Sequence, residues 1–230
     1  MTSDGEEHVP SAMDEFKHAR VPGVRPRDAA SLLLVDRSNG AHRVLVGRRG
    51  SAHVFMPNVY VFPGGRRDAR DHSLLFSKDL DARVFDRLLT GASARLGTAR
   101  ARALALAALR ELREETGLSF PEGTGTDLSR LRYVARAITP PGNVRRFDTR
   151  FFLAFLDECG FDLRHLADSD ELQDLRWLDI RELSSLKLPA ITTRVLEDVR
   201  DLIADEPSLP FGSPVNFYFM RRGRFIRSRL

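Results

Sequence analysis

Residues 108–118 read ALRELREETGL, a stretch that places three glutamates within five positions. Each residue of an α-helix advances about 100° around the axis, so Glu111, Glu114 and Glu115 share an arc of roughly 100°. Like charges at this spacing repel one another. A divalent cation reverses that repulsion, because crowded carboxylates on one rigid face are the hard oxygen ligands that Mg²⁺ or Mn²⁺ binds. The alternative is a solvated helix face on which neighbouring arginines neutralise the acids.

The sequence around this stretch favours the metal site. A helix is predicted over about residues 98–116, since alanine fills its first half and Gly117 follows at the usual C-terminal position. Upstream, a strand predicted over 58–62 runs into Pro63-Gly64-Gly65. Glycines at such a turn allow the backbone to approach a ligand closely. A strand, a PGG turn and a glutamate helix together form a more specific pattern than any one of them alone.

This pattern resembles the signature of the Nudix hydrolase family, which is Gly, five residues, Glu, seven residues, then Arg-Glu-apolar-x-Glu-Glu-x-Gly-apolar. Gly65 matches the first glycine of that signature. Its second half is matched by Arg110, Glu111, Leu112, Glu114, Glu115, Gly117 and Leu118. The resemblance extends over about residues 28–205. It implies an α/β (α+β) fold in which a mixed β-sheet is sandwiched between helices.

Two positions depart from the signature. At the position separated from Arg110 by seven residues the family has Glu, whereas this chain has Arg102. Counting forward from Gly65 leads to Asp71, and 38 residues then separate Asp71 from Arg110, so about 31 residues are inserted. We expect a helical insertion over about residues 72–98, with its amphipathic helix at about 75–90. Whether Asp71 replaces the missing glutamate is left open by the sequence.

The resemblance implies hydrolysis of a diphosphate with Mg²⁺ or Mn²⁺ as cofactor. Glu111, Glu114 and Glu115 would be metal ligands and catalytic residues, and Arg110 would orient them. An additional catalytic acid is expected from the loop at 168–171, with Glu171 preferred over Asp170. The alternative for that loop is a polar turn before the next strand.

Substrate contacts are expected from Gly64 and Gly65 and from two arginines, Arg48 and Arg49, that end the second predicted strand. Exposed strand-end arginines are the alternative. Arg146, Asp148 and Arg150 have the same ambiguity between substrate contact and a structural ion pair. The turn at 140–143 lies where such folds often receive substrate, although turn chemistry also explains it. Trp177 is expected in the core.

The interrupted signature resembles the peroxisomal-type coenzyme A diphosphatases and their bacterial relatives. These share the insertion after PGG and a strand like residues 146–152, RFDTRFF. Coenzyme A or an acyl-coenzyme A is therefore the expected substrate. The alternatives are an ADP-ribose, dinucleotide or RNA 5′-end pyrophosphohydrolase, or a non-catalytic Nudix-like binding or regulatory module.

Three segments are expected along the chain: a flexible N-terminal arm over residues 1–25, the Nudix domain over 26–205 and a basic C-terminal tail over 206–230. Apolar patterning predicts further strands and one more helix within the domain. The predicted strands lie at 29–35, 43–47, 132–137, 149–156 and 175–178, and the helix at about 192–203. The inserted helix is expected to cap the substrate pocket, form a dimer surface or pack on its own domain.

The composition is that of an ordinary globular protein with a net charge of +4. Arginine dominates over lysine, which a GC-rich bacterial genome explains, so nucleic acid binding is not expected. No apolar run is long enough to span a membrane. The lone Cys159 is expected to be an inert thiol. A cytoplasmic location is expected, and a peroxisomal one only in a eukaryote, where the ending Ser228-Arg229-Leu230 would be read as an address.

Overall fold

Strand β2 (Arg27–Asp36) lies in the middle of the sheet because its apolar residues are buried on both faces. The structure is a computed structural model, and it describes residues 7–8, 24–50, 56–90 and 97–230. The other strands are β1 (Glu7–His8), β3 (Arg43–Arg49), β4 (Tyr60–Val61), β5 (Gly64–Arg66), β6 (Arg132–Ile138), β7 (Phe147–Phe155), β8 (Leu172–Asp179), β9 (Asn216–Arg221) and β10 (Arg224–Arg229).

These strands form one mixed sheet in the described part of the chain. Their order is β1-β10-β9-β6-β7-β2-β3-β4, with β5 paired to β2 and β8 paired to β3. The pairs β2–β7 and β6–β9 are parallel, whereas β2–β3, β6–β7 and β9–β10 are antiparallel. The mixed sheet predicted from the sequence is therefore confirmed.

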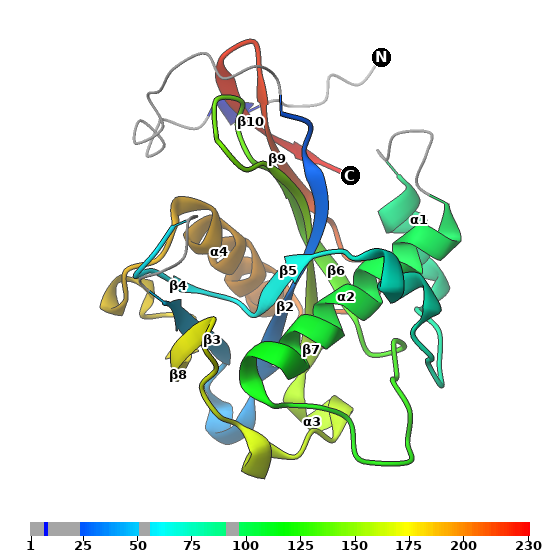
Figure 1. Cartoon of the computed structure of the whole chain (residues 1–230). Coiled ribbons are helices and arrows are strands. Elements are labelled where there is room, and N and C mark those ends of the chain that lie inside the picture. Colours follow the sequence, from blue (N-terminus) through cyan, green and yellow to red (C-terminus); the bar gives the residue numbers. More distant parts are fainter. Residues whose placement is uncertain (1–6, 9–23, 51–55, 91–96) are drawn as a thin grey trace.

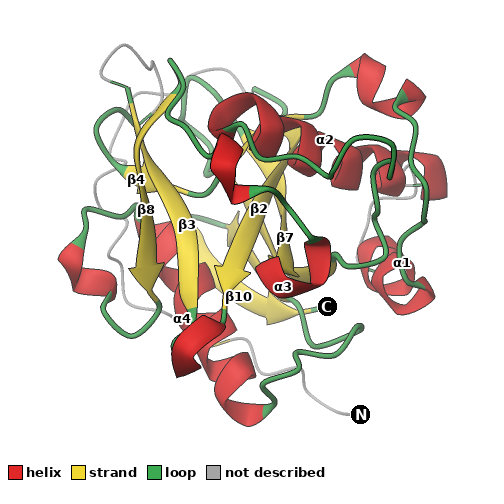
Figure 2. Ribbon diagram, turned by 90° about the horizontal axis from the view of Figure 1, so that it is seen from below, coloured by secondary structure: helices red, strands yellow, loops and turns green. Residues whose placement is uncertain are grey.

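Helices cover both faces of this sheet (Figure 1). The α-helices are α1 (Ala82–Leu89), α2 (Thr98–Thr116), α3 (Leu156–Cys159) and α4 (Ala190–Asp205), and short 3₁₀ turns occur at η2 (Ser38–Gly40), η3 (Ala69–Ser73), η4 (Leu163–His165) and η5 (Leu183–Ser185). Figure 2 shows the same layers from below, with the strands between α2 and α4. No helix of the described residues is both long and apolar enough to cross a bilayer.

The alternation of β2 divides the core into two clusters. Leu32 and Leu34 pack in a cluster with Leu104 and Leu112 of α2. Leu33 and Val35 belong to the opposite cluster, which contains Val195, Leu196 and Val199 of α4. Burial of apolar side chains on both faces contributes about 25 cal/mol per Å² removed from water, so each helix is held to the sheet by its own apolar face.

Helix α2 ends where the sequence predicted. Gly117 has a φ of 74°, a left-handed conformation that glycine adopts without a steric penalty. A Cβ added there would lie 2.3 Å from the carbonyl oxygen of His165, so no larger residue fits. The glycine therefore both ends the glutamate helix and lets the chain pass against the loop before β8.

The inserted helix is shorter than predicted. Residues 75–81 are not helical, because Ser77 and Lys78 hydrogen-bond instead through their backbones to the segment at 126–128. Helix α1 begins only at Ala82, after Asp81 accepts a hydrogen bond from the N–H of Arg83. The prediction of a helix from residue 75 was wrong at its N-terminal half for this reason.

The C-terminal segment differs from the expected tail. Residues 216–229 form the hairpin of β9 and β10, which extends the sheet beyond β6 (Figure 1). The Tyr218 hydroxyl and an Arg227 N–H both donate to the buried Asp198 of α4, each at 2.6 Å. The arginines of this segment therefore belong to a folded element. Of the predicted N-terminal arm, Glu7–His8 pairs with β10, and residues 1–6 and 9–23 lie outside the described residues.

Candidate active site

Glu115 is the most buried of the three glutamates, with 8% of its surface exposed. Its Oε2 accepts a hydrogen bond of 2.7 Å from the N–H of Gly64, so the PGG turn and the glutamate helix meet directly. Burial raises the pKa of Glu115 to about 8, and the charges of Glu111 and Glu171 add to the rise. The Gly64 N–H and Arg49 act in the opposite direction.

Glu111 lies against the second glycine of the turn. A Cβ added to Gly65 would lie 2.5 Å from the carboxyl carbon of Glu111, so any side chain at position 65 would displace that carboxylate. Burial raises the pKa of Glu111 in spite of the opposing charge of Arg110. The sequence predicted that the backbone at this glycine approaches a neighbouring group closely, and that group is the carboxylate of Glu111.

Arg110 holds two of the glutamates in place. Its Nη1 donates to Oε1 of Glu111 at 2.7 Å and to Oε2 of Glu114 at 2.8 Å. Burial alone would lower the pKa of the guanidinium, but the hydrogen bonds and charges of Asp71 and Glu111 raise it. Arg110 is thus a fixed cation at this helix face and not an arginine free to contact a ligand.

Asp71 is the residue whose role the sequence left open. It is fully buried, and its carboxylate accepts from Nε of Arg110 at 2.7 Å and from Nη2 at 3.2 Å. Its Oδ2 also accepts from the N–H of Asp68, which fixes the turn η3. Asp71, which comes just before the inserted segment, therefore lies against Arg110 of the glutamate helix.

Arg102, which stands where the signature has glutamate, has a different role. Its guanidinium binds Asp79 through two hydrogen bonds of 2.9 and 2.6 Å. It also lies 5.0 Å from the ring centre of Phe76 and 5.6 Å from that of Phe85. The residue attaches the insertion to α2 and contacts none of the three glutamates.

The structure separates the two arginines predicted to bind substrate. Arg49 lines a cavity together with Glu115 and Glu171. Burial lowers the pKa of Arg49, and the charges of Glu115 and Glu171 oppose that change. Arg48 points to the other side of β3, where its charge acts on Tyr60 and Asp174. Arg48 is not among the residues that line this cavity, because alternate residues of a strand face opposite sides.

The cavity beside the glutamates has a volume of about 540 Å³. This volume lies in the range of pockets that hold nucleotide-sized ligands. Its walls come from the PGG turn, the face of the sheet that α4 covers, and the residues at the start of α4. Its principal lining residues are Ser31, Arg49, Phe62, Gly64, Gly65, Arg66, Glu115, Ala137, Ile138, Thr139, Pro140, Arg145, Phe147, Phe151, Glu171, Lys187, Leu188, Pro189, Ala190, Ile191, Thr192, Tyr218 and Phe225.

The donor chemistry at the glutamate face fits a hard divalent cation, although the three predicted ligands do not converge. Oε2 of Glu111 and Oε1 of Glu115 accept no hydrogen bond from any described residue. Both oxygens of Glu114 are engaged, one by Arg110 and the other by Arg70 at 3.0 Å. Within the described ranges no three acidic, His or Cys side chains are grouped closely enough to hold a metal. Two free carboxylate oxygens are thus what this structure offers.

The other predicted residues fall outside this corner. Asp148 forms ion pairs with Arg136 at 2.8 Å and Arg150 at 3.0 Å, so the structural alternative holds for it. Arg146 donates to the backbone carbonyls of Thr139 and Val24. These groups lie at the end of the sheet near the turn at 140–143, of which Pro140 lines the cavity.

Two further predictions concern the core. Trp177 packs partly buried against the cluster on the α2 face, in agreement with the core assignment. Cys159 is buried, and burial raises the pKa of its thiol to about 12. Such a thiol stays protonated at neutral pH and is a poor nucleophile, as the sequence predicted.

Several cavity residues were not found from the sequence. Tyr218 and Phe225 come from the segment expected to be a tail, and Lys187 and Thr192 come from the start of α4. In the sequence these residues are distinguished only by where they stand: they flank a predicted helix or lie in an alternating aromatic run. Neither pattern shows which cavity the side chain lines.

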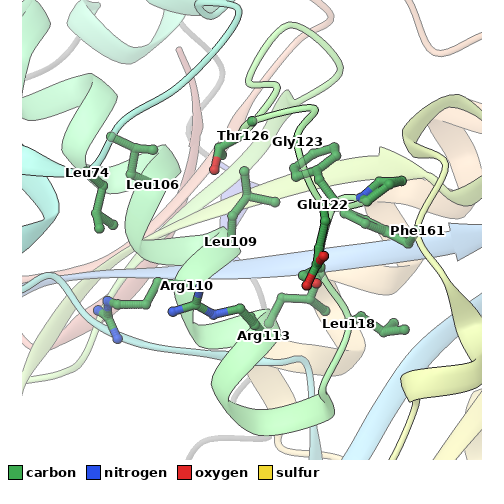
Figure 3. A pocket seen from close by; sticks show the side chains of 15 residues that line it. Leu74, Leu106, Leu109, Arg110, Arg113, Leu118, Glu122, Gly123, Thr126 and Phe161 are labelled. Atoms are coloured by element: carbon green, nitrogen blue, oxygen red, sulfur yellow. The ribbon is translucent and has the colours of Figure 1, made fainter.

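A second cavity, of about 420 Å³, lies on another side of α2 (Figure 3). Leucines of α2 and the loop at 118–126 form most of its wall, and Arg110 and Arg113 lie at its edge. It contains none of the three glutamates and neither glycine of the PGG turn. The chemistry expected of the glutamate face therefore belongs to the larger cavity.

Comparisons with known proteins agree with the geometry. A sequence profile described as the NUDIX domain matches residues 99–199. The Caenorhabditis elegans protein named "Putative nudix hydrolase 7" is 29% identical over 186 residues, which cover 68% of this chain and 52% of that protein. The chain thus spans about half the length of this curated relative.

Among solved structures, a NUDIX hydrolase from Alicyclobacillus acidocaldarius superimposes with a TM-score of 0.55 and 26% identity. That alignment covers 76% of this chain and 90% of the other. The matched profile includes the whole glutamate face, and the solved structure shares the sheet and helix arrangement that positions it. The chain is therefore similar to Nudix hydrolases in sequence and has the Nudix α/β fold.

Proposed function

We propose that this chain hydrolyses a diphosphate linkage in a nucleoside diphosphate derivative, with Mg²⁺ or Mn²⁺ as its cofactor. The observation that carries the proposal is the corner of the large cavity where Glu115, Glu171 and Arg49 lie together. This corner combines carboxylates, a cation and the two glycines of the PGG turn in a space of nucleotide size.

The divalent cation would be held by the glutamate face. Glu111 and Glu115 each offer an oxygen that no described residue engages, and Glu114 is the third predicted ligand. When bound, such a cation neutralises the bridging and leaving oxygens of a diphosphate. Arg110 keeps the Glu111 carboxylate oriented through its hydrogen bond, and Asp71 in turn fixes Arg110.

The reaction requires a proton acceptor and a cation for the phosphate charge. Water attacks one phosphorus, its oxygen bonds to that phosphorus, and the bond to the bridging oxygen breaks while the water proton leaves. Glu171 lines the cavity with an exposed carboxylate that no described residue hydrogen-bonds, so it is our proton acceptor. Arg49, on the same wall, would compensate the charge of the phosphates.

Coenzyme A or an acyl-coenzyme A is the substrate we propose. Support comes from the insertion within the signature and from the strand RFDTRFF, which resemble the coenzyme A diphosphatase branch. The apolar wall that Phe147, Ile191 and Phe225 give the cavity also suits a long, partly apolar substrate. Cleavage would yield a phosphopantetheine fragment and an adenosine bisphosphate.

A substrate screen tests the proposal. Purified protein with Mg²⁺ or Mn²⁺ is incubated with coenzyme A, ADP-ribose, NADH and capped or triphosphorylated RNA, and the phosphate-containing products are identified by mass spectrometry. We expect cleavage of coenzyme A, and a loss of about a hundredfold or more in Glu115→Gln and Glu171→Gln. Glu122→Gln, an exposed glutamate outside the large cavity, is the matched control.

The outcomes separate the alternatives. Cleavage of ADP-ribose or RNA but not of coenzyme A contradicts the proposed substrate, while the proposed reaction class, diphosphate hydrolysis, still holds. Full activity of Glu115→Gln contradicts the assigned site. No product from any compound, with the protein folded by circular dichroism, contradicts the enzyme and favours a non-catalytic binding module.

A further inference from the structure

The C-terminal hairpin forms one end of the large cavity. Tyr218 of β9 and Phe225 of β10 both line it. Their rings lie nearly parallel, with an angle of 16° between the ring planes and 5.8 Å between the ring centroids. Aromatic rings prefer this offset-stacked arrangement over a face-to-face sandwich. The hairpin follows residues 99–199, which the NUDIX profile matches, so it is an addition to the matched part of the chain.

The ring of Phe225 rests on a fixed neighbour. Tyr218 is only 1% exposed, and its hydroxyl donates to the buried Asp198 of α4 at 2.6 Å. Arg227, which lies opposite Tyr218 in the register of the hairpin, donates to the same carboxylate at 2.6 Å. Phe225 packs against Tyr218 and keeps part of its own surface exposed. The hairpin therefore presents Phe225 to the cavity on a rigid support.

One row of residues across the sheet connects the hairpin with the PGG turn. The register places side by side Arg66 of β5, Ala29 of β2, Thr149 of β7, Ala137 of β6 and Tyr218 of β9. All five residues line the cavity. Neighbouring strands lie about 4.8 Å apart, so four spacings give this row a length of about 19 Å. The three middle residues are small, and the cavity runs over them from the PGG turn to the hairpin.

The two ends of this row differ in chemistry. The end at the PGG turn holds Glu115, Glu171 and Arg49, which suit a divalent cation and phosphate charge. The end at the hairpin holds the rings of Tyr218 and Phe225. The face of an aromatic ring binds a planar ring by stacking, without the need for hydrogen bonds. In a nucleoside diphosphate derivative, the planar ring is the base.

We propose that Phe225, supported by Tyr218, is the surface on which the base of the substrate stacks, so that the C-terminal hairpin selects substrates that carry a nucleoside. This inference rests on the proposed function for the location of the diphosphate beside Glu115. It also orients the substrate. The diphosphate lies at the glutamate corner, the sugar lies over the small residues of the row, and the base lies at the hairpin, away from the non-nucleoside arm.

Binding without turnover tests the stacking surface. Isothermal titration calorimetry in Mg²⁺ buffer compares adenosine 5′-monophosphate with ribose 5-phosphate, which lacks only the base. We expect the wild type to bind the nucleotide at least about fivefold more tightly, since a stacked base contributes about 1–3 kcal/mol, which converts to roughly five- to a hundredfold. Phe225→Leu keeps an apolar side chain but removes the ring, and it should reduce this ratio below about twofold. Phe225→Tyr should restore the ratio.

The matched control is Phe219→Leu. Phe219 follows Tyr218 in β9, so it faces the other side of the hairpin, where it stacks on Phe217 at 4.6 Å, and it does not line the cavity. This variant should keep the wild-type ratio, with an unchanged Tm for all variants. Equal affinities of the wild type for the two compounds, no binding of either, or an equal fall of the ratio in Phe225→Leu and Phe219→Leu would each overturn the stacking surface.

A kinetic comparison separates this inference from the proposed function. In an active enzyme, Phe225→Leu should raise the KM for coenzyme A at least about fivefold. The same variant should leave the inhibition constant of 4′-phosphopantetheine, which has no base, as in the wild type. An unchanged KM, or weaker inhibition by 4′-phosphopantetheine alone, contradicts the stacking surface while the hydrolase stands. A preference for the nucleotide that depends on Phe225, in a protein that cleaves nothing, supports the stacking surface and contradicts the hydrolase.

Discussion

Asp71 shows how one buried carboxylate connects two distant parts of the site. It lies 39 positions before Arg110, yet both of its oxygens bind that guanidinium. Arg110 in turn fixes Glu111, which lies against Gly65. Counting residues along the sequence identifies Asp71 but does not decide its role. The insertion that follows Asp71 has no sequence pattern that shows how close Asp71 lies to the glutamate helix.

Asp28 is the second buried carboxylate whose charge is compensated by distant arginines. It accepts from Arg100 at 2.6 Å and from Arg67 at 3.2 Å, and Arg150 lies 3.5 Å away. Burial alone would raise the pKa of Asp28, but the hydrogen bond and charge of Arg100 and the charge of Arg150 hold it below its ordinary value. The ion pairs therefore favour the ionised carboxylate in the folded state.

We expect Asp28→Asn to lower the free energy of unfolding by about 1–3 kcal/mol at pH 7. A lowered pKa in the folded state stabilises the protein above the unfolded pKa of about 3.9, and this contribution is lost as the pH falls through the folded value. The difference between wild type and variant, measured by urea unfolding at pH 7, 5 and 3, should therefore shrink only below about pH 4.

Asp86→Asn, at an exposed aspartate of α1, serves as control and should change the free energy of unfolding by less than about 0.5 kcal/mol. A difference between wild type and Asp28→Asn that stays constant from pH 7 to pH 3 would show that the charge of Asp28 is not what stabilises the fold.

At the scale of elements, the insertion is attached to the glutamate helix by Arg102. This arginine binds Asp79 and lies over the rings of Phe76 and Phe85. It occupies one side of α2, while the glutamates occupy the side toward the PGG turn. Helix α2 thus presents its glutamates on one side and, on another side, the arginine that binds the insertion.

We expect Arg102→Ala to loosen the insertion without unfolding the domain. Hydrogen exchange of the amides at 76–85, followed by mass spectrometry, should accelerate about fivefold, because the ion pair and the ring contacts together contribute about 1 kcal/mol. Arg113→Ala, at an exposed arginine of the same helix that forms no ion pair with any described residue, should leave exchange in this segment as in the wild type. Equal exchange in both variants would contradict the attachment.

The elements that could be predicted from the sequence are those with local signals. The glutamate face follows from spacing along one helix, and Gly117 marks its end. The start of α1 could not be predicted, since it depends on backbone hydrogen bonds between Ser77–Lys78 and residues 126–128. Periodicity alone extended that helix by about two turns.

At the scale of the whole molecule, the cavity is formed where three distant segments meet. The PGG turn and β3 supply the glutamate corner, the start of α4 supplies one wall, and the C-terminal hairpin supplies Tyr218 and Phe225 (Figure 1). The hairpin is held there by Asp198, which binds both Tyr218 and Arg227.

The sequence therefore indicated that the glutamate helix and the PGG turn belong together, but it did not indicate the shape of the cavity beside them. Ion pairs such as Asp198–Arg227 join residues 29 positions apart, and a single sequence carries no local pattern for them. An arginine-rich stretch that reads as a solvated tail forms two strands, and Arg227 in it pairs with Asp198 of α4.

The central claim is that Glu111 and Glu115 form a divalent-cation site beside the large cavity. Electron paramagnetic resonance of free Mn²⁺, titrated into the protein, measures this binding directly. We predict saturable binding to the wild type and to Glu122→Gln, and at least about tenfold weaker binding to Glu115→Gln with an unchanged Tm. Equal Mn²⁺ binding by the wild type and Glu115→Gln, or no binding by the wild type, would contradict the account.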